Sequence, residues 1–278
     1  MKNYPVIRFF LLFCSLTLAF QAHARLSLEE AEAAISAAES PQEKGLAIAR
    51  AQKARDTGWQ DSTSEMEMIL RTPGGRENTR IIQIKSLEVL DDGDKSLMVF
   101  NQPRDVEGTA FLSFSRIDGP DDQWIYLPAL ERVRRIASRN RAGSFMGSEF
   151  SYEDLASFEV EKYDFKYLRD EACGDVQCHV IESYPKDEYT GYSRLVSWVE
   201  KDTYRIQKID FYDLRKEHLK TMTVKEYTLL EDRYWRPTRS VMQNHQNGRS
   251  TELVWRNIEL KTGLSESDFS QQNLRRAY

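Results

Sequence analysis

Two closely spaced cysteines are the residues best suited to covalent chemistry in this chain. Cys173 and Cys178 lie in "ACGDVQCHV", on either side of a Gly-Asp pair that is typical of a hairpin turn. In an oxidising compartment, two cysteines this close are expected to form one disulfide. The alternative is a zinc site that adds His179, but four ligands are needed and only His218 and His245 remain as further donors of this kind. We therefore predict a disulfide and no metal site.

Familiar catalytic patterns do not occur in the sequence. It has no G-x-S-x-G, no H-E-x-x-H, no phosphate-binding loop and no dinucleotide-binding glycine pattern. Acidic pairs such as Glu153/Asp154 fall at expected turns or helix starts, where capping and solvation explain them. Carboxylates that the fold brings together would still permit a hydrolase, so that alternative stays open. We expect a protein that is not an enzyme and that uses no cofactor.

A dense basic segment is the clearest candidate for binding. Five arginines fall within ten positions: Arg132, Arg134, Arg135, Arg139 and Arg141. Because large apolar residues are few in this segment, most of the guanidinium groups must face water or an anion. A solvated strand and turn is one interpretation. Lipid phosphates or an acidic partner surface would suit the planar guanidinium group equally well, and an anionic membrane attracts each nearby arginine by about 1 kcal/mol. We predict that these arginines face an anionic partner or make transient contact with a membrane surface.

The N-terminus predicts export. Lys2 and Arg8 precede an apolar run at residues 9–20. "AHA" at residues 22–24 then supplies small residues before a cleavage site. We expect residues 1–24 to be a signal peptide, cleaved after Ala24, and the mature protein to be periplasmic. Loss of the two basic residues takes the formal net charge from −5 to −7, which argues against general nucleic-acid binding.

Two helices are predicted at about residues 27–57. "SLEE" (Ser27 to Glu30) is a capping box followed by apolar residues at helical spacing. "SPQE" (Ser40 to Glu43) repeats the box with proline at the first helical position. The second helix is expected to end near Thr57, with Gly58 as its terminator.

Strand patterns occupy most of residues 62–262. In "SEMEMIL", Met66, Met68 and Leu70 alternate with the positions between them, as one face of a strand does. Short, turn-rich connections such as "DGPDD" and "EKDT" separate roughly eleven such segments, which is typical of an antiparallel meander. The pattern lapses at "GSEFSYEDLASF", where Ser151 and Asp154 could cap a short helix.

Several strands are apolar on both faces. In "TELVWRNIEL", Leu253 and Trp255 point one way while Val254, Ile258 and Leu260 point the other. A sheet of about eleven strands does not stay open and flat. We therefore expect a mainly β protein with a strongly curved antiparallel sheet, forming a single domain over residues 25–278.

The order of several motifs resembles the outer-membrane lipoprotein-sorting protein family, distant relatives of the periplasmic lipoprotein carrier LolA. The resembling segments run from about Arg55 to Leu274 and include "FNQPRDVEGTAFL", "WIYLPALERVRRI", "SFMGSEFSYEDL" and "YRIQKIDFYD". The resemblance implies a half-barrel in which helices and the short helical insertion cover an apolar cavity. It also implies a carrier of lipid or lipoprotein acyl chains towards the outer membrane, or an accessory module of an exporter of the resistance-nodulation-division class. It carries over no catalytic residue.

Candidate residues follow from these expectations. The large apolar side chains predicted to line the cavity are Met66, Met68, Leu70, Met98, Phe100, Phe114, Trp124, Tyr126, Trp198, Met222 and Trp255. Those predicted to form a lid over it are Phe145, Met146, Phe150 and Leu155. Methionine suits a surface that accepts variable apolar guests, and ordinary core packing is the alternative for each of these positions.

Overall fold

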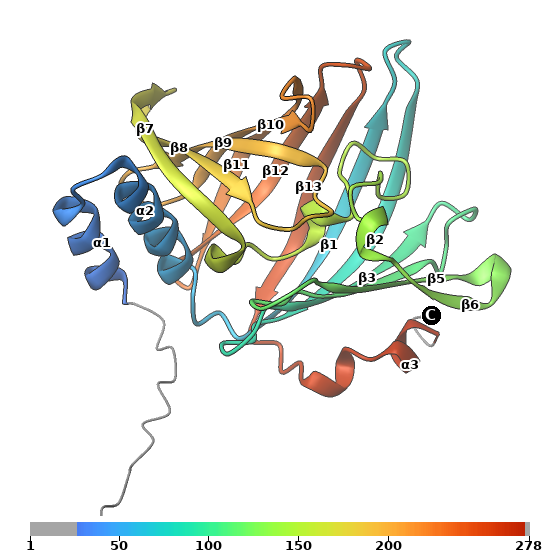
Figure 1. The fold of residues 1–278 in the computed structure, drawn as a ribbon. Helices are drawn as coiled ribbons and strands as arrows, with labels where there is room; N and C mark the ends of the chain where they lie inside the picture. Colours follow the sequence, from blue (N-terminus) through green and yellow to red (C-terminus); the bar gives the residue numbers. More distant parts are fainter. Residues whose placement is uncertain (1–26, 276–278) are drawn as a thin grey trace, which may run out of the picture.

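The computed structural model describes residues 27–275, and the predicted signal peptide therefore lies outside the described residues. The chain begins with α1 (Leu28–Ala37) and α2 (Pro41–Arg55), as predicted (Figure 1). Both capping boxes are present: Ser27 accepts a hydrogen bond from the backbone of Glu30, and Ser40 accepts one from the backbone of Glu43. No helix among residues 27–275 is long and apolar enough to cross a membrane.

Within the described residues, thirteen strands form one antiparallel sheet, so the protein is mainly β as predicted, with more strands than the roughly eleven expected from the pattern. The strands are β1 (Asp61–Arg71), β2 (Glu77–Leu87), β3 (Lys95–Gln102), β4 (Ala110–Phe114), β5 (Asp122–Leu127), β6 (Arg132–Arg135), β7 (Tyr163–Cys173), β8 (Val176–Pro185), β9 (Tyr192–Glu200), β10 (Ile206–Asp213), β11 (His218–Leu230), β12 (Tyr234–Asn244) and β13 (Ser250–Leu260). A last short helix, α3, spans Gln271–Leu274. Single 3-10 turns lie at Pro128–Leu130, Ser138–Asn140, Glu153–Leu155, Val160–Lys162 and Glu266–Asp268.

The sheet consists of two meanders joined in its middle. Strands β1 to β6 follow one another outwards on one side, β13 back to β7 on the other, and β1 pairs with β13. Strands β6 and β7 are therefore the two edges, and they do not pair with each other. Because consecutive strands β6 and β7 lie at opposite edges, residues 136–162 must carry the chain across the sheet.

Two segments differ from the strand pattern in the sequence. Residues 132–135 form the short edge strand β6. The hydrophobic pattern did not indicate a separate strand here, because arginines occupy most of its positions. The segment "FEVEKYDFKYL" reads as one strand, but the strand begins only at Tyr163, after the 3-10 turn Val160–Lys162. Side-chain alternation alone does not show where backbone pairing begins.

Apolar clusters lie on both faces of the sheet, which explains why many strands are apolar on both sides. On the inner face, one cluster includes Met66, Phe111 and Phe145, and a second lies under α1 and α2 and includes Ile48 and Phe165. On the outer face, the C-terminal segment packs over β3, β4 and β5, and a further cluster lies on β8 and β9. Figure 1 shows α1 and α2 beside β7 and α3 at the other end of the sheet.

Close backbone contact holds α2 against edge strand β7. Gly45 lies in the middle of α2, where glycine ordinarily costs about 1 kcal/mol relative to alanine. A Cβ atom at this position would lie 2.8 Å from the backbone nitrogens of Lys166 and Tyr167. The glycine therefore permits a helix-to-strand distance that any side chain would prevent.

The predicted disulfide is present. Cys173 at the end of β7 is bonded to Cys178 near the start of β8. Gly174 between them adopts a left-handed conformation with φ of 70°, which glycine accommodates without strain. The bridge closes the β7–β8 hairpin at the edge of the sheet.

Candidate binding cavity

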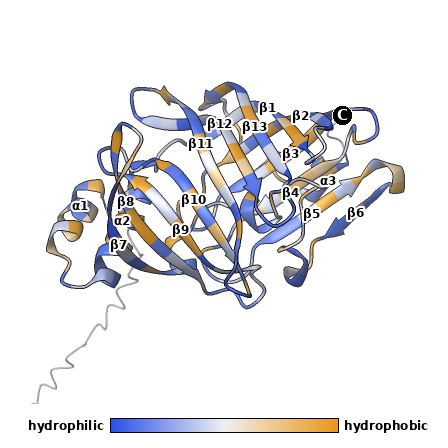
Figure 2. Ribbon diagram, turned by 90° about the horizontal axis from the view of Figure 1, so that it is seen from above, coloured by the Kyte–Doolittle hydropathy of each residue, from blue (hydrophilic) through white to orange (hydrophobic). Residues whose placement is uncertain are grey.

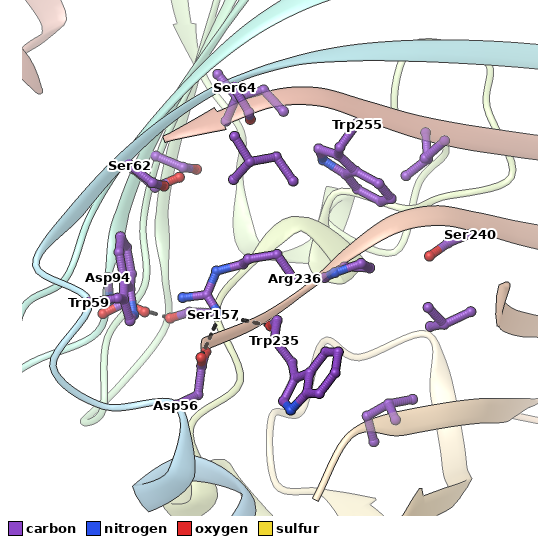
Figure 3. Close-up of a pocket in the computed structure, with 18 of the residues that line it drawn as sticks. Asp56, Trp59, Ser62, Ser64, Asp94, Ser157, Trp235, Arg236, Ser240 and Trp255 are labelled. Atoms are coloured by element: carbon purple, nitrogen blue, oxygen red, sulfur yellow. Dashed lines mark hydrogen bonds and ion pairs between the residues drawn. The ribbon is translucent and has the colours of Figure 1, made fainter. Parts of the chain in front are cut away.

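A cavity of about 580 Å³ opens on the inner face of the sheet. Strands β1–β3 and β10–β13 form its floor, and its other walls are the end of α2 and the segment that crosses from β6 to β7. Figure 3 shows side chains from these elements converging on one space. The volume lies within the range of about 300–1,000 Å³ that is usual for sites that bind small molecules.

The floor of the cavity is mostly apolar. Met66 and Met68 of β1 line it together with Met98 of β3, Met222 of β11 and Trp255 of β13. The methionine side chains are unbranched and flexible, so they can adjust to guests of different shape. An apolar surface of this kind gains free energy when it removes hydrocarbon from water.

A bulge adds one more apolar residue to the wall. The pairing of β1 with β13 shifts between Thr63 and Glu65, and Asn257 adopts a left-handed conformation with φ of 51°. The extra residue brings Ile258 into the cavity beside Trp255. The expectation that Ile258 points to the opposite face from Trp255 is therefore wrong, because strict alternation fails at a bulge.

Charged residues line one end of the cavity, which we call the mouth. Asp56, which follows α2, forms an ion pair with Arg236 of β12 (Figure 3). Arg236 also donates to the carbonyl of Trp235 at 3.0 Å, and its guanidinium lies 5.6 Å from the centre of the Trp59 ring. The mouth thus combines charge with flat aromatic surface, whereas the floor is mostly apolar.

A second acidic group lies further along the wall. The backbone N–H of Asp94 donates to the hydroxyl of Ser157 at 3.3 Å, and the side chain of Asp94 accepts from the backbone of Val89 (Figure 3). Burial raises the pKa of the Asp94 carboxyl to about 6, against the opposing effect of Lys53. This carboxyl therefore changes charge close to neutral pH.

The segment of residues 141–157, which we call the crossing segment, forms the opposite wall. Phe150 and Leu155 line the cavity from this side. Phe145 is completely buried, with its ring centre 5.9 Å from that of Phe100 and 5.1 Å from that of Phe111. Met146 is half-buried at the edge of the same cluster. The four predicted lid residues thus pack into the inner core.

A buried ion pair holds the crossing segment to the sheet. The Nζ atom of Lys220 on β11 lies 2.6 Å from the Asp154 carboxylate, and both side chains are only about one-twentieth exposed (5% and 6%). Lys220 also donates to the carbonyl of Glu149 at 2.9 Å, and the Tyr192 hydroxyl donates to Asp154 at 2.8 Å. We call Asp154 and Lys220 the buried clamp. Because every member has a partner, the charges can be tolerated inside the protein.

Glu153, the neighbour of the clamp, is held differently. Its carboxylate accepts hydrogen bonds from the backbone of Gly191 and the hydroxyl of Thr190, both at 3.0 Å. Burial and the adjacent charge of Asp154 raise the pKa of Glu153 to about 7. The folded protein therefore binds a proton here at a pH where the unfolded chain does not.

The stabilisation contributed by Glu153 and Asp94 is expected to fall as pH rises from about 4.5 to 7. Glu153 and Asp94 both have pKa values above the usual carboxyl range, so the folded state retains protons that the unfolded state releases in this window. Replacing Glu153 by Gln should make the free energy of unfolding less dependent on pH, with a gain of roughly 2 kcal/mol at pH 8. Urea titrations at pH 5.5 and 8 measure this. The exposed Glu107→Gln is the control, and an unchanged pH dependence in Glu153→Gln would contradict the assignment.

The structure divides the eleven cavity candidates into three groups. Five of them line the cavity: Met66, Met68, Met98, Met222 and Trp255. Leu70 and Phe100 lie on the same inner face but pack in the core without lining it. The other four are on the outer face: Phe114, Trp124 and Tyr126 under the C-terminal segment, and Trp198 on β9. Their assignment to the cavity needs correction, because neighbouring strand residues point to opposite faces and aromatic character does not indicate which.

The five arginines of the basic segment differ in their exposure to solvent. Arg132, Arg134, Arg135 and Arg139 are exposed, whereas Arg141 is buried and its side chain is only 4% exposed. Arg141 forms ion pairs with Asp121, at 2.9 Å, and with Asp187. The expectation that Arg141 faces an external anion is therefore wrong: these two carboxylates, from distant segments, already compensate its charge.

Several residues of the site were not expected from the sequence. Asp56 and Arg236 are far apart in the chain, and no local pattern connects them. Lys220 could have been noticed, because it stands two positions before Met222 and must share its face of β11. A lysine in an inward-facing row requires an internal partner, and that partner is Asp154.

Comparison with known proteins places this architecture among solved structures. A domain described as an outer-membrane lipoprotein-sorting protein from Vibrio parahaemolyticus is 52% identical, with a TM-score of 0.83, over 84% of this chain and 100% of its own. A DUF1329 family protein from Desulfovibrio piger is 32% identical, with a TM-score of 0.81, over 84% of this chain and 99% of its own.

A more distant structure shares the fold. A LolA superfamily protein from Nitrosomonas europaea is 20% identical, with a TM-score of 0.67, over 85% of this chain and 100% of its own. Residues 92–276 also match a family model that is described only as an uncharacterized protein. No curated protein matches the chain.

Proposed function

Because this chain belongs to the outer-membrane lipoprotein-sorting protein family and shares the fold of the LolA superfamily, we propose that it is a carrier of lipid or lipoprotein acyl chains in the cell envelope. In this proposal the sheet acts as a half-barrel, and the cavity shelters the hydrocarbon during transfer towards the outer membrane. No catalytic step is part of the proposed role.

The observation that carries the proposal is the apolar cavity on the inner face. Its floor includes the methionines described above, Trp255, Leu253 and Val224. Sheltering an acyl chain from water contributes about 0.8 kcal/mol for each methylene group. A partly inserted chain would therefore bind with useful affinity and could still be released to a competing acceptor.

The mouth provides a place for the polar end of such a molecule. Arg55, Arg233 and Arg236 lie around it with Asp56, next to the Trp59 and Trp235 rings. Indole rings are suited to the boundary between hydrocarbon and water, because each ring presents both an apolar surface and an N–H donor. The headgroup or the protein part of the cargo would remain at this end.

Two features of the chain support an envelope location. The N-terminal sequence has the order of a cleavable export signal, and Cys173–Cys178 is a disulfide, which persists in an oxidising compartment. We propose that the mature protein begins after Ala24 and works in the periplasm.

Bound lipid is the direct test. Protein purified from the periplasm without detergent should release acyl-containing lipids on extraction with organic solvent, detected by mass spectrometry. After removal of the lipid, it should bind a fluorescent fatty acid whose emission rises in an apolar environment. Absence of both extracted lipid and probe binding would rule out the carrier role.

A second candidate function is an accessory module that docks on a resistance-nodulation-division exporter or another envelope machine. The exposed arginines of β6 favour a contact with an acidic partner. Crosslinking in cells from residues of β6 should then trap a protein, and this outcome is independent of lipid in the cavity.

A further inference from the structure

The short strand β6 leaves one edge of the sheet open. It is the last strand in the sheet order and pairs with β5 only. Figures 1 and 2 both show it at the outer margin of the molecule, with no further strand beside it. The opposite edge differs, because α2 packs closely on β7.

The register identifies which backbone groups face outwards. Ile136 donates its N–H to the carbonyl of Gln123 at 2.8 Å, and antiparallel strands alternate between residues that bond the neighbour and residues that do not. Arg134 and Arg132 therefore direct their backbone groups towards β5. Val133 and Arg135 direct their N–H and C=O groups away from the sheet, where another strand could pair with them.

Arginine side chains flank these groups on both faces. Arg132 and Arg134 stand opposite Leu127 and Ile125, on the inner side, and Arg135 stands opposite Trp124, on the outer side. Within residues 27–275, no carboxylate forms an ion pair with Arg132, Arg134 or Arg139. Arg135 is paired with Asp122, but its side chain remains 63% exposed. The edge thus offers positive charge on each side of its free hydrogen-bonding groups.

A hollow lies next to the same strand. A pocket of about 390 Å³ is bounded by Val133 of β6 and by Gln271, Gln272 and Arg275 of the C-terminal segment. A side chain from an added strand would reach it from the outer side of β6. Free backbone groups, flanking charge and a side-chain pocket therefore occur together at one edge.

From this arrangement we propose that β6 is a docking site for an extended acidic segment of a partner protein, which adds to the sheet as a further strand. Backbone pairing at Val133 and Arg135 gives the affinity, and carboxylates on alternate faces meet the arginines. A membrane would attract the charges but would leave the outward N–H and C=O groups of Val133 and Arg135 unpaired. Leu130 is an exposed large apolar side chain at the tip of this hairpin. The geometry therefore favours a polypeptide partner.

A short fluorescein-labelled peptide that repeats Glu-Glu-Thr-Thr, and so carries carboxylates on both faces of a strand, is the probe. It is titrated into the purified protein at low salt and followed by fluorescence anisotropy. Replacing Arg132, Arg134 and Arg135 by Glu should weaken binding about tenfold or more. Val133→Pro removes an outward N–H without removing a bond to β5, and proline is tolerated on such an edge. It should weaken binding about fivefold, whereas Val133→Thr, which keeps the N–H, should not.

Two further measurements separate strand pairing from simple charge attraction. Hydrogen exchange should show protection of the Val133 and Arg135 amides when the peptide is bound. Vesicles of equal parts phosphatidylglycerol and phosphatidylcholine should not compete with it. Circular dichroism confirms that each variant folds. The proposal is overturned if the peptide does not bind, if Val133→Pro binds as well as Val133→Thr, or if the vesicles bind through the arginines and the peptide does not.

Discussion

Ser64→Trp is expected to remove most acyl-chain binding without unfolding the protein. Ser64 of β1 is half-buried and faces the cavity beside Met66, so an indole at this position would occupy space that the acyl chain needs (Figure 3). Displacing about four methylene groups costs about 3 kcal/mol, which corresponds to about a 100-fold increase in Kd. Titration with a fluorescent fatty acid measures this change.

The matched control is the adjacent position on the same strand. Thr63 does not line the cavity, and strand alternation places it on the outer face. Thr63→Trp adds the same side chain to β1 and should leave the Kd of the fatty acid within about twofold of the original value. Equal binding by the two variants would show that the acyl chain binds elsewhere. Loss of thermal stability in Ser64→Trp alone would instead require a smaller residue, such as Ser64→Leu.

Lys220→Met is expected to lower the free energy of unfolding by roughly 3–5 kcal/mol, because it leaves the Asp154 carboxylate buried without its cation. The Tyr192 hydroxyl and the backbone N–H of Ser151 would still donate to Asp154, which limits the loss but cannot replace a full charge. The crossing segment should open first. Urea unfolding gives the change in stability, and hydrogen exchange at residues 141–157 shows where it acts.

Two comparison variants separate the buried clamp from general charge effects. Arg256 pairs with Glu67 at 3.0 Å, but its side chain is 58% exposed, so Arg256→Met should cost less than about 1 kcal/mol. Removing both charges of the clamp, with Lys220→Met and Asp154→Leu together, should restore much of the lost stability. A double variant as unstable as the single one would mean that Lys220 acts through its other contacts.

The clamp also bears on how a cargo would enter. The crossing segment is tied down by Asp154, by Glu153 and by Glu149, which accepts a hydrogen bond from Asn244 at 2.7 Å. These contacts favour a fixed wall. Entry is then expected at the mouth, where the surface ion pair between Asp56 and Arg236 is weaker than a buried pair.

Local features of the fold were predictable from local sequence. The capping boxes at Ser27 and Ser40 involve residues three positions apart, so their geometry follows from neighbouring residues alone. The β7–β8 hairpin and its disulfide likewise depend on a short segment around Gly174. Most strands could be identified because side-chain alternation is a property of one strand by itself.

The cavity was predictable only in part. Met66 and Met68 alternate with polar residues on β1, and both line the cavity. Trp124 and Trp198 lie on strands that are apolar on both sides, and there hydrophobicity cannot say which face is inward. That choice depends on which elements cover each face, and the covering elements come from opposite ends of the chain.

The sequence by itself determined the local elements, the disulfide hairpin and the presence of a basic segment, because each depends on neighbouring residues. The tertiary structure alone decided that Arg141 is neutralised by Asp121 and Asp187, that Lys220 meets Asp154, and that Asp56 meets Arg236. These pairs form because the chain must cross from one sheet edge to the other and because β1 pairs with β13. Pairing between distant segments leaves no spacing pattern in the sequence.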